Sequence, residues 1–140
     1  NQDTAMLAIQ ATINHARGMA GGSGKVGTMG FCLGGRLAFK AALETDADAN
    51  VSYYGVGLEG LVGGALRGPV LVHIAEKDHF VPDAAKAAIQ AALEGERDAT
   101  VMVHPGVDHA FARIGGKAYD GRAATIAGGR SAEFLVRHLA

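Results

Sequence analysis

The stretch "GTMGFCLGGRLAFKAA" (residues 27–42) contains the only cysteine of the chain, Cys32, in a turn bounded by glycines. The apolar run "KVGTMGF" (residues 25–31) is typical of a buried strand, and "LGGRLAFKAALE" (residues 33–44) is rich in helix-forming residues. A strand, a turn of the form G-x-nucleophile-x-G and a helix together make the pattern of a nucleophile elbow. The pattern predicts that Cys32 projects from the carboxyl end of the sheet.

The elbow also predicts close packing and a positive environment around Cys32. Small residues two positions before and after the nucleophile, here Gly30 and Gly34, allow the strand and the helix to approach each other. The helix N-terminus presents N–H groups and a partial positive charge, which favour a thiolate and an oxyanion alike. The backbone N–H of Leu33 is then the expected oxyanion donor. The turn alone fits an inert buried cysteine equally well, because free cysteines are often buried.

The rest of the chain predicts alternating helices and strands. A first helix is expected to be capped by Asp3, to carry Met6, Ile9 and Ile13 at helical spacing, and to stop at Gly18. The remaining expected elements are strands at residues 50–57, 69–75 and 99–104 and helices at residues 82–95 and 131–140. Apolar strands alternating with helices predict an α/β domain of the α/β-hydrolase kind, with a mostly parallel sheet and helices on both faces.

The number of strands suggests that this sheet is incomplete. Four strands form a narrow doubly wound sheet, and the chain begins in a helix. We therefore expect residues 1–140 to be the C-terminal portion of a single α/β-hydrolase domain whose N-terminal strands are missing from this chain.

Composition narrows the class of partner and the compartment. Hydrophobic residues make up 49% of the chain, which is enough for a sizeable core, and the net charge is −1 with 19% charged residues. This balance argues against a nucleic acid or an anionic membrane surface as partner and favours small molecules or other proteins. The single cysteine cannot form an internal disulfide, and neither a membrane span nor the pattern of a signal peptide is present. We expect a cytoplasmic protein.

A nucleophilic cysteine needs a base, and the base needs an orienting acid. In the order nucleophile, acid, histidine, which is that of α/β-hydrolases, Asp78 follows the strand at 69–75 and His109 follows the strand at 99–104. Glu76 is a competing acid, and His104, at a strand end, is a competing base. Taken singly, Asp78 could be a helix-capping residue and His109 a solvated loop residue.

A metal or phosphate site is the less favoured alternative. Nitrogen and oxygen ligands gather near the expected carboxyl edge of the sheet: His73, Asp78, His79, His104, Asp108 and His109. They form no compact motif such as H-E-x-x-H, and no G-x-x-x-x-G-K-[ST] phosphate loop occurs. We expect neither a catalytic metal nor a cofactor.

Four segments, "GFCLGG", "YYGVGLE", "DHFVP" and "HAFAR", resemble the dienelactone hydrolases (carboxymethylenebutenolidases), small α/β-hydrolases with a cysteine nucleophile. The resemblance extends through essentially the whole chain in order. It implies hydrolysis of a lactone or related ester through a triad of Cys32, His109 and Asp78 and a thioester acyl-enzyme. It further implies that Arg113 binds a substrate carboxylate and that Tyr54 and Phe80 line the pocket, although ordinary core packing would also explain these two aromatic residues.

The chain departs from the family pattern in two respects. The family has Gly-His-Ser-Phe around the catalytic histidine, whereas this chain has Asp108-His109-Ala110-Phe111, so that a hydroxyl is lost and a negative charge stands beside the base. The family's N-terminal strands, which supply a second oxyanion donor, a glutamate near the thiol and a further arginine, do not map onto this chain. Two alternatives stay open: a general carboxylesterase on the same triad, and an incomplete fragment that acts as an association module, either by pairing with a separate N-terminal segment or as a homo-oligomer.

Overall fold

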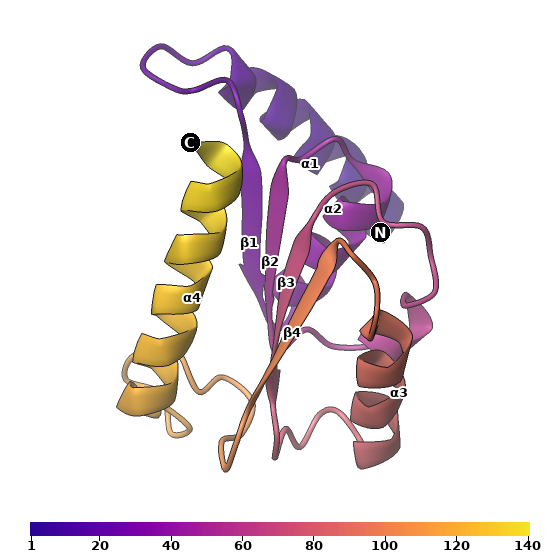
Figure 1. The fold of residues 1–140 in the computed structure, drawn as a ribbon, viewed down its shortest axis with the longest axis vertical. Helices are drawn as coiled ribbons and strands as arrows, with labels where there is room; N and C mark the ends of the chain where they lie inside the picture. The colour runs from indigo at the N-terminus through magenta and orange to yellow at the C-terminus, as the bar shows by residue number, and fades with distance from the viewer.

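The computed structural model describes residues 1–140 and contains one sheet of four parallel strands that pair in chain order (Figure 1). The strands are β1 (Gly27–Phe31), β2 (Ala49–Tyr53), β3 (Val70–Ala75) and β4 (Ala99–His104). The helices are α1 (Gln2–Arg17), α2 (Leu33–Glu44), the 3-10 turn η1 (Leu58–Gly60), α3 (Asp83–Leu93) and α4 (Gly121–Leu139). The predicted order of elements and the parallel α/β architecture are confirmed.

Helices cover both faces of the sheet, with α2 and α3 on one face and α4 on the other (Figure 1). All six residues of β3 are buried: Val70, Val72 and Ile74 pack with α2 and α3, while Leu71 and Ala75 belong to the cluster beneath α4. The core is therefore two apolar layers separated by the sheet. Because both faces of this strand are covered, neither face is solvated, and the segment is apolar in sequence except for His73.

Helix α4 begins ten residues earlier than predicted, at Gly121 instead of residue 131. Asp120 caps it by accepting a hydrogen bond from the backbone N–H of Ala123. The first ten residues of α4 include Gly128 and Gly129. Because glycine lowers helix propensity, the sequence pattern does not predict a helix there. A buried stripe at helical spacing, formed by Ala123, Ala127, Ser131 and Phe134, overrides that weakness by packing against the sheet.

Three other predicted boundaries shift for local reasons. The strand expected at residues 50–57 ends at Tyr53, because Tyr54 has a φ of 37° and cannot continue a strand. The cap of α1 is Asn1, whose side chain accepts from the backbone N–H groups of Asp3 and Thr4, so Asp3 is not the cap. The helix expected at 82–95 ends at Leu93, before Gly95.

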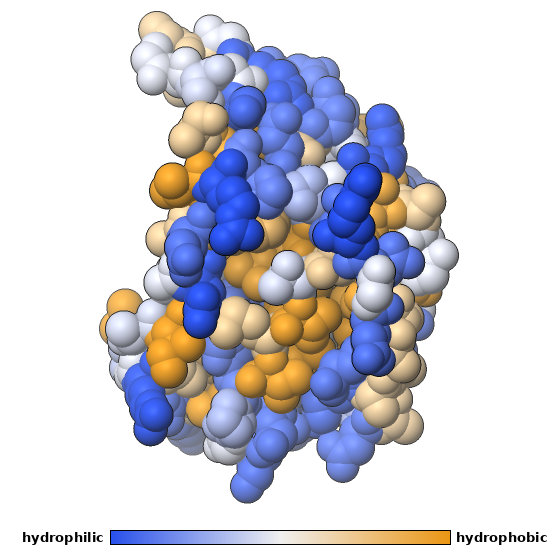
Figure 2. Space-filling model, viewed as in Figure 1, coloured by the Kyte–Doolittle hydropathy of each residue, from blue (hydrophilic) through white to orange (hydrophobic).

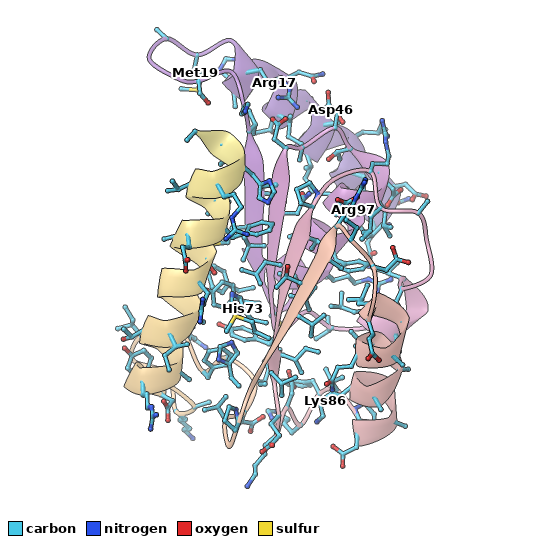
Figure 3. The ribbon with its side chains drawn as sticks, in the orientation of Figure 1. Arg17, Met19, Asp46, His73, Lys86 and Arg97 are labelled. Carbon is cyan, nitrogen blue, oxygen red and sulfur yellow. The ribbon has the colours of Figure 1, made fainter.

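The surface of the face seen in Figure 2 is apolar in its centre, over the edge strand β4, and polar around that centre. Two ion pairs connect the end of α1 to the loop after α2. Arg17 pairs with Asp48 at 2.6 Å and with Asp46 at 3.4 Å (Figure 3). No helix here has both the length and the apolar character that a bilayer crossing requires.

Candidate active site

Cys32 alone connects β1 to α2, and its backbone is strained. It has φ 57° and ψ −116°, a conformation that residues other than glycine rarely adopt. Its N–H donates to the carbonyl of Tyr53 at 3.0 Å, and its carbonyl accepts from the N–H of Arg36 at 3.1 Å. These bonds hold the elbow in place, so that the thiol stands at the carboxyl end of the sheet, directly before the first turn of a helix.

The glycines around the elbow have different roles. A Cβ on Gly30 would overlap the backbone carbonyl of Gly34, so the strand and the helix do touch at this point. A Cβ on Gly34 itself would meet no atom within 4 Å. The second steric requirement lies instead at Gly35, where a Cβ would lie 2.6 Å from the carbonyl oxygen of Tyr53. The prediction of a close approach is confirmed at Gly30, and the prediction that Gly34 must be small is wrong.

A pocket of about 510 Å³ opens beside Cys32, with walls that are mainly apolar. It brings together residues from four separate segments of the chain: Phe31, Cys32, Tyr54, Phe80, His109, Ala110, Ala112 and Arg113. Five of the seven residues singled out in the sequence therefore share one cavity. Asp78 lies behind His109, and Leu33, the first residue of α2, follows Cys32 directly.

His109 and Asp78 form a buried pair. The distance between Nδ1 of His109 and Oδ2 of Asp78 is 2.9 Å, and both residues are less than a tenth exposed. The other oxygen of Asp78 accepts the backbone N–H of Phe80 at 2.9 Å. The competing acid, Glu76, is exposed and accepts the backbone N–H of Gly106 instead. Asp78 is therefore the carboxylate that can orient His109.

Two aromatic rings contact the imidazole of His109 edge to face. Tyr54 has its ring centroid at 5.0 Å and Phe80 at 4.7 Å, with interplanar angles of 61° and 76°. Tyr54 is buried, and this burial raises the pKa of its phenol to about 12, so that it stays neutral. Phe80 is 60% exposed and belongs to the wall of the pocket rather than to the core. These contacts restrict the orientation of the imidazole.

Backbone strain is concentrated at this pocket. Only three residues other than glycine have a positive φ, namely Cys32 at 57°, Tyr54 at 37° and Ala110 at 65°. All three line the same cavity. Such conformations cost about 1–3 kcal/mol each and persist only where the surrounding structure enforces them, most often at functional sites.

The competing base, His104, lies in a separate buried network. His73 Nδ1 is 3.0 Å from His104 Nε2, and His73 Nε2 is 2.8 Å from the hydroxyl of Ser131, which also contacts the hydroxyl of Tyr53 at 2.9 Å. Figure 3 shows His73 between the sheet and α4. Burial, with a smaller contribution from His104, lowers the pKa of His73 to about 3, and burial also lowers the pKa of His104. Both rings are therefore neutral structural groups.

The six side chains considered as metal ligands separate into three pairs. His73 pairs with His104, His79 with Asp108, and His109 with Asp78, and no group of three or more lies in a metal-binding arrangement. Three pocket residues were not anticipated: Phe31, Ala110 and Ala112. Phe31 occupies the variable position directly before the nucleophile in the elbow pattern, which was the available signal, whereas the two alanines carry no chemical signal at all.

A parallel sheet with helices on both faces and an elbow at its carboxyl edge defines the α/β-hydrolase class. The crystal structure of a provisionally named dienelactone hydrolase from Klebsiella pneumoniae superposes with a TM-score of 0.83 at 24% identity, covering 97% of this chain and 62% of that chain. The sequence model of the dienelactone hydrolase family matches residues 1–139. The chain belongs to the dienelactone hydrolase family.

Curated relatives give the same family. A protein of Azospirillum brasilense, provisionally named carboxymethylenebutenolidase, is 56% identical over 109 residues, which cover 76% of this chain and 47% of the relative. Carboxymethylenebutenolidase 1 of Cupriavidus pinatubonensis is 35% identical over 129 residues, which cover 91% of this chain and 55% of the relative. The chain thus spans about half the length of the curated relatives it matches.

Proposed function

We propose that this chain carries the catalytic side chains of a hydrolase that opens lactones or cleaves related carboxylic esters. In this proposal Cys32 is the nucleophile, His109 the base and Asp78 the acid that orients the base. The observation that carries it is the meeting, at one pocket, of a strained cysteine and a buried histidine–carboxylate pair. Family membership supports the substrate class, and the name carboxymethylenebutenolidase describes a lactone that bears a carboxylate.

Acylation begins with loss of the thiol proton. Because Nδ1 of His109 is bound to Asp78, Nε2 is the nitrogen left to accept that proton. The Cys32 thiolate then forms a C–S bond with the ester carbonyl. Collapse of the tetrahedral intermediate breaks the C–O bond, and the leaving oxygen takes the proton back from His109. The product of this half-reaction is a thioester, in which the opened ring stays attached to Cys32.

In deacylation, His109 again acts first as a base, with water in place of the thiol as the proton donor. A water molecule gives a proton to Nε2 of His109 and attacks the thioester carbonyl. The C–S bond then breaks, the carboxylic acid is released, and the proton on His109 returns to the sulfur of Cys32. Asp78 holds the imidazole in the tautomer that has Nε2 free, and it stabilises the imidazolium without taking the proton itself. The edge-to-face contacts of Tyr54 and Phe80 limit rotation of the ring during both transfers.

The oxyanion of each tetrahedral intermediate is assigned to the backbone N–H of Leu33. As the first residue of α2, Leu33 has an N–H with no acceptor inside the helix. The positive end of the helix dipole adds to the stabilisation of negative charge at the same point.

Arg113 is the proposed binding group for a substrate carboxylate. It lines the pocket and forms no ion pair with any carboxylate of the chain. A guanidinium matches a carboxylate through two parallel hydrogen bonds. In a pocket whose other walls are mainly apolar, this contact would select lactones that carry a free carboxylate.

The nucleophile is tested with Cys32→Ala in the intact protein. Hydrolysis of a dienelactone and of a chromogenic ester should fall by about 10³-fold or more, because no covalent route remains. His109→Ala should cause a similar loss, whereas His15→Ala, at an exposed position on α1, should leave the rate unchanged. A Cys32→Ala protein that retains turnover would exclude the proposed mechanism, and an inactive, self-associating parent protein would favour the association module.

The substitution Arg113→Met distinguishes between the two proposed activities, hydrolysis of carboxylated lactones and general carboxylesterase activity. For a carboxylated lactone, kcat/KM should fall by about 10- to 100-fold, which corresponds to one charge-assisted contact. For the methyl ester of the same compound the change should be less than about threefold. Equal losses on both substrates would show that Arg113 does not read the carboxylate and would favour the general esterase.

A further inference from the structure

We propose that Asp108 is a positioning residue, which clips the loop of the acid to the loop of the base and so holds Asp78 and His109 at hydrogen-bonding distance. The inference rests on the proposed function, because it assigns a role to Asp108 within that triad. Asp108 is also one of the two residues beside the base, with Ala110, that depart from the family pattern. We call the contacts of Asp108 with His79 and His109 the loop clip.

Oδ1 of Asp108 makes three of the four contacts in the loop clip, and Oδ2 makes the fourth, at 3.0 Å from Nδ1 of His79. Oδ1 of Asp108 accepts from the backbone N–H of His79 at 3.0 Å, from Nδ1 of His79 at 2.8 Å and from the backbone N–H of His109 at 2.6 Å. Neither backbone N–H has a backbone acceptor. One of these N–H groups belongs to the residue directly after the acid, and the other belongs to the base itself. Asp108 therefore fixes the main chain within one residue of each member of the pair.

The neighbouring contacts show why the effect should be local. Beyond the ends of β3 and β4, the N–H of Glu76 donates to the carbonyl of His104 at 3.0 Å, and the N–H of Lys77 donates to the carbonyl of Val107 at 2.9 Å. These two bonds continue the pairing of the strands through the main chain alone. The loop clip lies next along the two loops, and a side chain supplies its acceptor. Removing that side chain frees the tip of the loops and leaves the sheet paired.

The carboxylate of Asp108 is already paired with hydrogen-bond donors of the two loops. The carboxylate does not line the pocket, and its oxygens face the ring and backbone N–H of His79 and the backbone N–H of His109. These donors, the His79 ring above all, lower the pKa of Asp108 to about 2. The side chain is 43% exposed, so it can be replaced without opening a cavity. The carboxylate beside the base thus accepts hydrogen bonds from both loops and joins them.

The test compares Asp108→Ala with Asp108→Asn in the intact protein. Asp108→Ala removes the acceptor, and kcat should fall by about 10- to 100-fold, the effect of a misplacement of about 1 Å in a catalytic group. KM should change by less than about threefold, because residue 108 is not part of the pocket wall. Asp108→Asn keeps an amide oxygen that can accept both backbone N–H groups, and it should restore kcat to within about threefold of the parent. Asp98→Ala is the matched control, since that carboxylate is 41% exposed and precedes β4 at the opposite end of the strand.

Backbone amide exchange gives a readout that does not depend on activity. The amides of His79 and His109 should exchange at least about tenfold faster in Asp108→Ala and at about the parental rate in Asp108→Asn, because an open N–H loses its protection. Faster exchange with unchanged kcat would overturn the positioning role, as would a lower melting temperature alone or an Asp108→Asn protein no better than Asp108→Ala. Activity in Cys32→Ala would remove the proposed function and the loop clip together, whereas an inactive Cys32→Ala beside a fully active Asp108→Ala would remove the loop clip alone.

Discussion

Acidification should destabilise the fold through one buried imidazole, that of His73. This side chain is fully buried, and its two ring nitrogens contact His104 at 3.0 Å and Ser131 at 2.8 Å. A neutral ring satisfies both contacts, as donor on one side and acceptor on the other. Burial opposes the charged form and lowers the pKa from 6.5 to about 3 in the folded protein.

The sign and size of the effect follow from the two pKa values. Below pH 6.5 the unfolded chain binds a proton at this position, whereas the folded chain stays neutral until the pH approaches about 3. Folding stability is therefore present above pH 6.5 and is lost as the pH falls, at about 1.4 kcal/mol per pH unit. Between pH 7 and pH 5 the loss from His73 alone is about 2 kcal/mol. The lowered pKa of His104 acts in the same direction.

Urea unfolding followed by circular dichroism at pH 7, 6 and 5 measures this slope. The aspartates with a lowered pKa, such as Asp46 and Asp48, start from 3.8 and contribute only below that range, so the chosen window isolates the histidines. His73→Gln should lose about 1.4 kcal/mol per pH unit of the parental slope at the acid end of the window. His15→Gln, exposed on α1, should keep the parental slope. A flat parental profile, or the same slope in His73→Gln, would refute the reasoning.

Two further substitutions test how backbone and sequence are matched. Gly30→Ala should destabilise the fold by more than about 3 kcal/mol, because the new Cβ meets the carbonyl of Gly34, whereas Gly34→Ala, with nothing within 4 Å, should change the free energy of unfolding by less than about 1 kcal/mol. Equal melting temperatures for the two variants would contradict the elbow geometry. Gly128→Ala, at an exposed position in α4 with nothing within 4 Å, should stabilise the protein by about 0.5–1 kcal/mol in urea unfolding, and a loss of stability would indicate that α4 is not a regular helix there.

The elements of this fold were predictable where the signal is local. The strand before Cys32 and the helix after it appear in the sequence as an apolar run and a run of helix formers, and both form as expected. The first ten residues of α4 escaped prediction because their glycines lower helix propensity, and the packing that compensates comes from the distant strands β2 and β3. The same division applies to the elbow. The pattern predicts the need for a small Gly30, but the contact that demands Gly35 involves Tyr53 on the next strand.

The candidate site divides in the same way. The chain order of nucleophile, acid and histidine singled out Cys32, Asp78 and His109, and the structure gathers them at one edge of the sheet. The loop clip could not be predicted from the sequence, because in the sequence Asp108 is only a negative charge next to the base, with no visible partner. Only the fold shows that the residue after the acid, His79, turns its N–H and ring toward that carboxylate. A charge next to a catalytic group is informative once its partners are known.

The contacts that hold the side chain of His109 differ from those that hold the side chain of Cys32. This difference indicates which of the two side chains is easier to move in the proposed reaction. The His109 ring is bound by Asp78 and contacted by Tyr54 and Phe80, while Asp108 holds its backbone. The hydrogen bonds of Cys32 come from its backbone, its side chain packs against the core cluster beneath α4, and its sulfur makes no hydrogen bond with the imidazole. Rotation about one side-chain bond of the cysteine is cheap compared with moving a ring held from several sides. If Cys32 and His109 act together as proposed, rotation of the thiol is therefore a smaller rearrangement than movement of the imidazole.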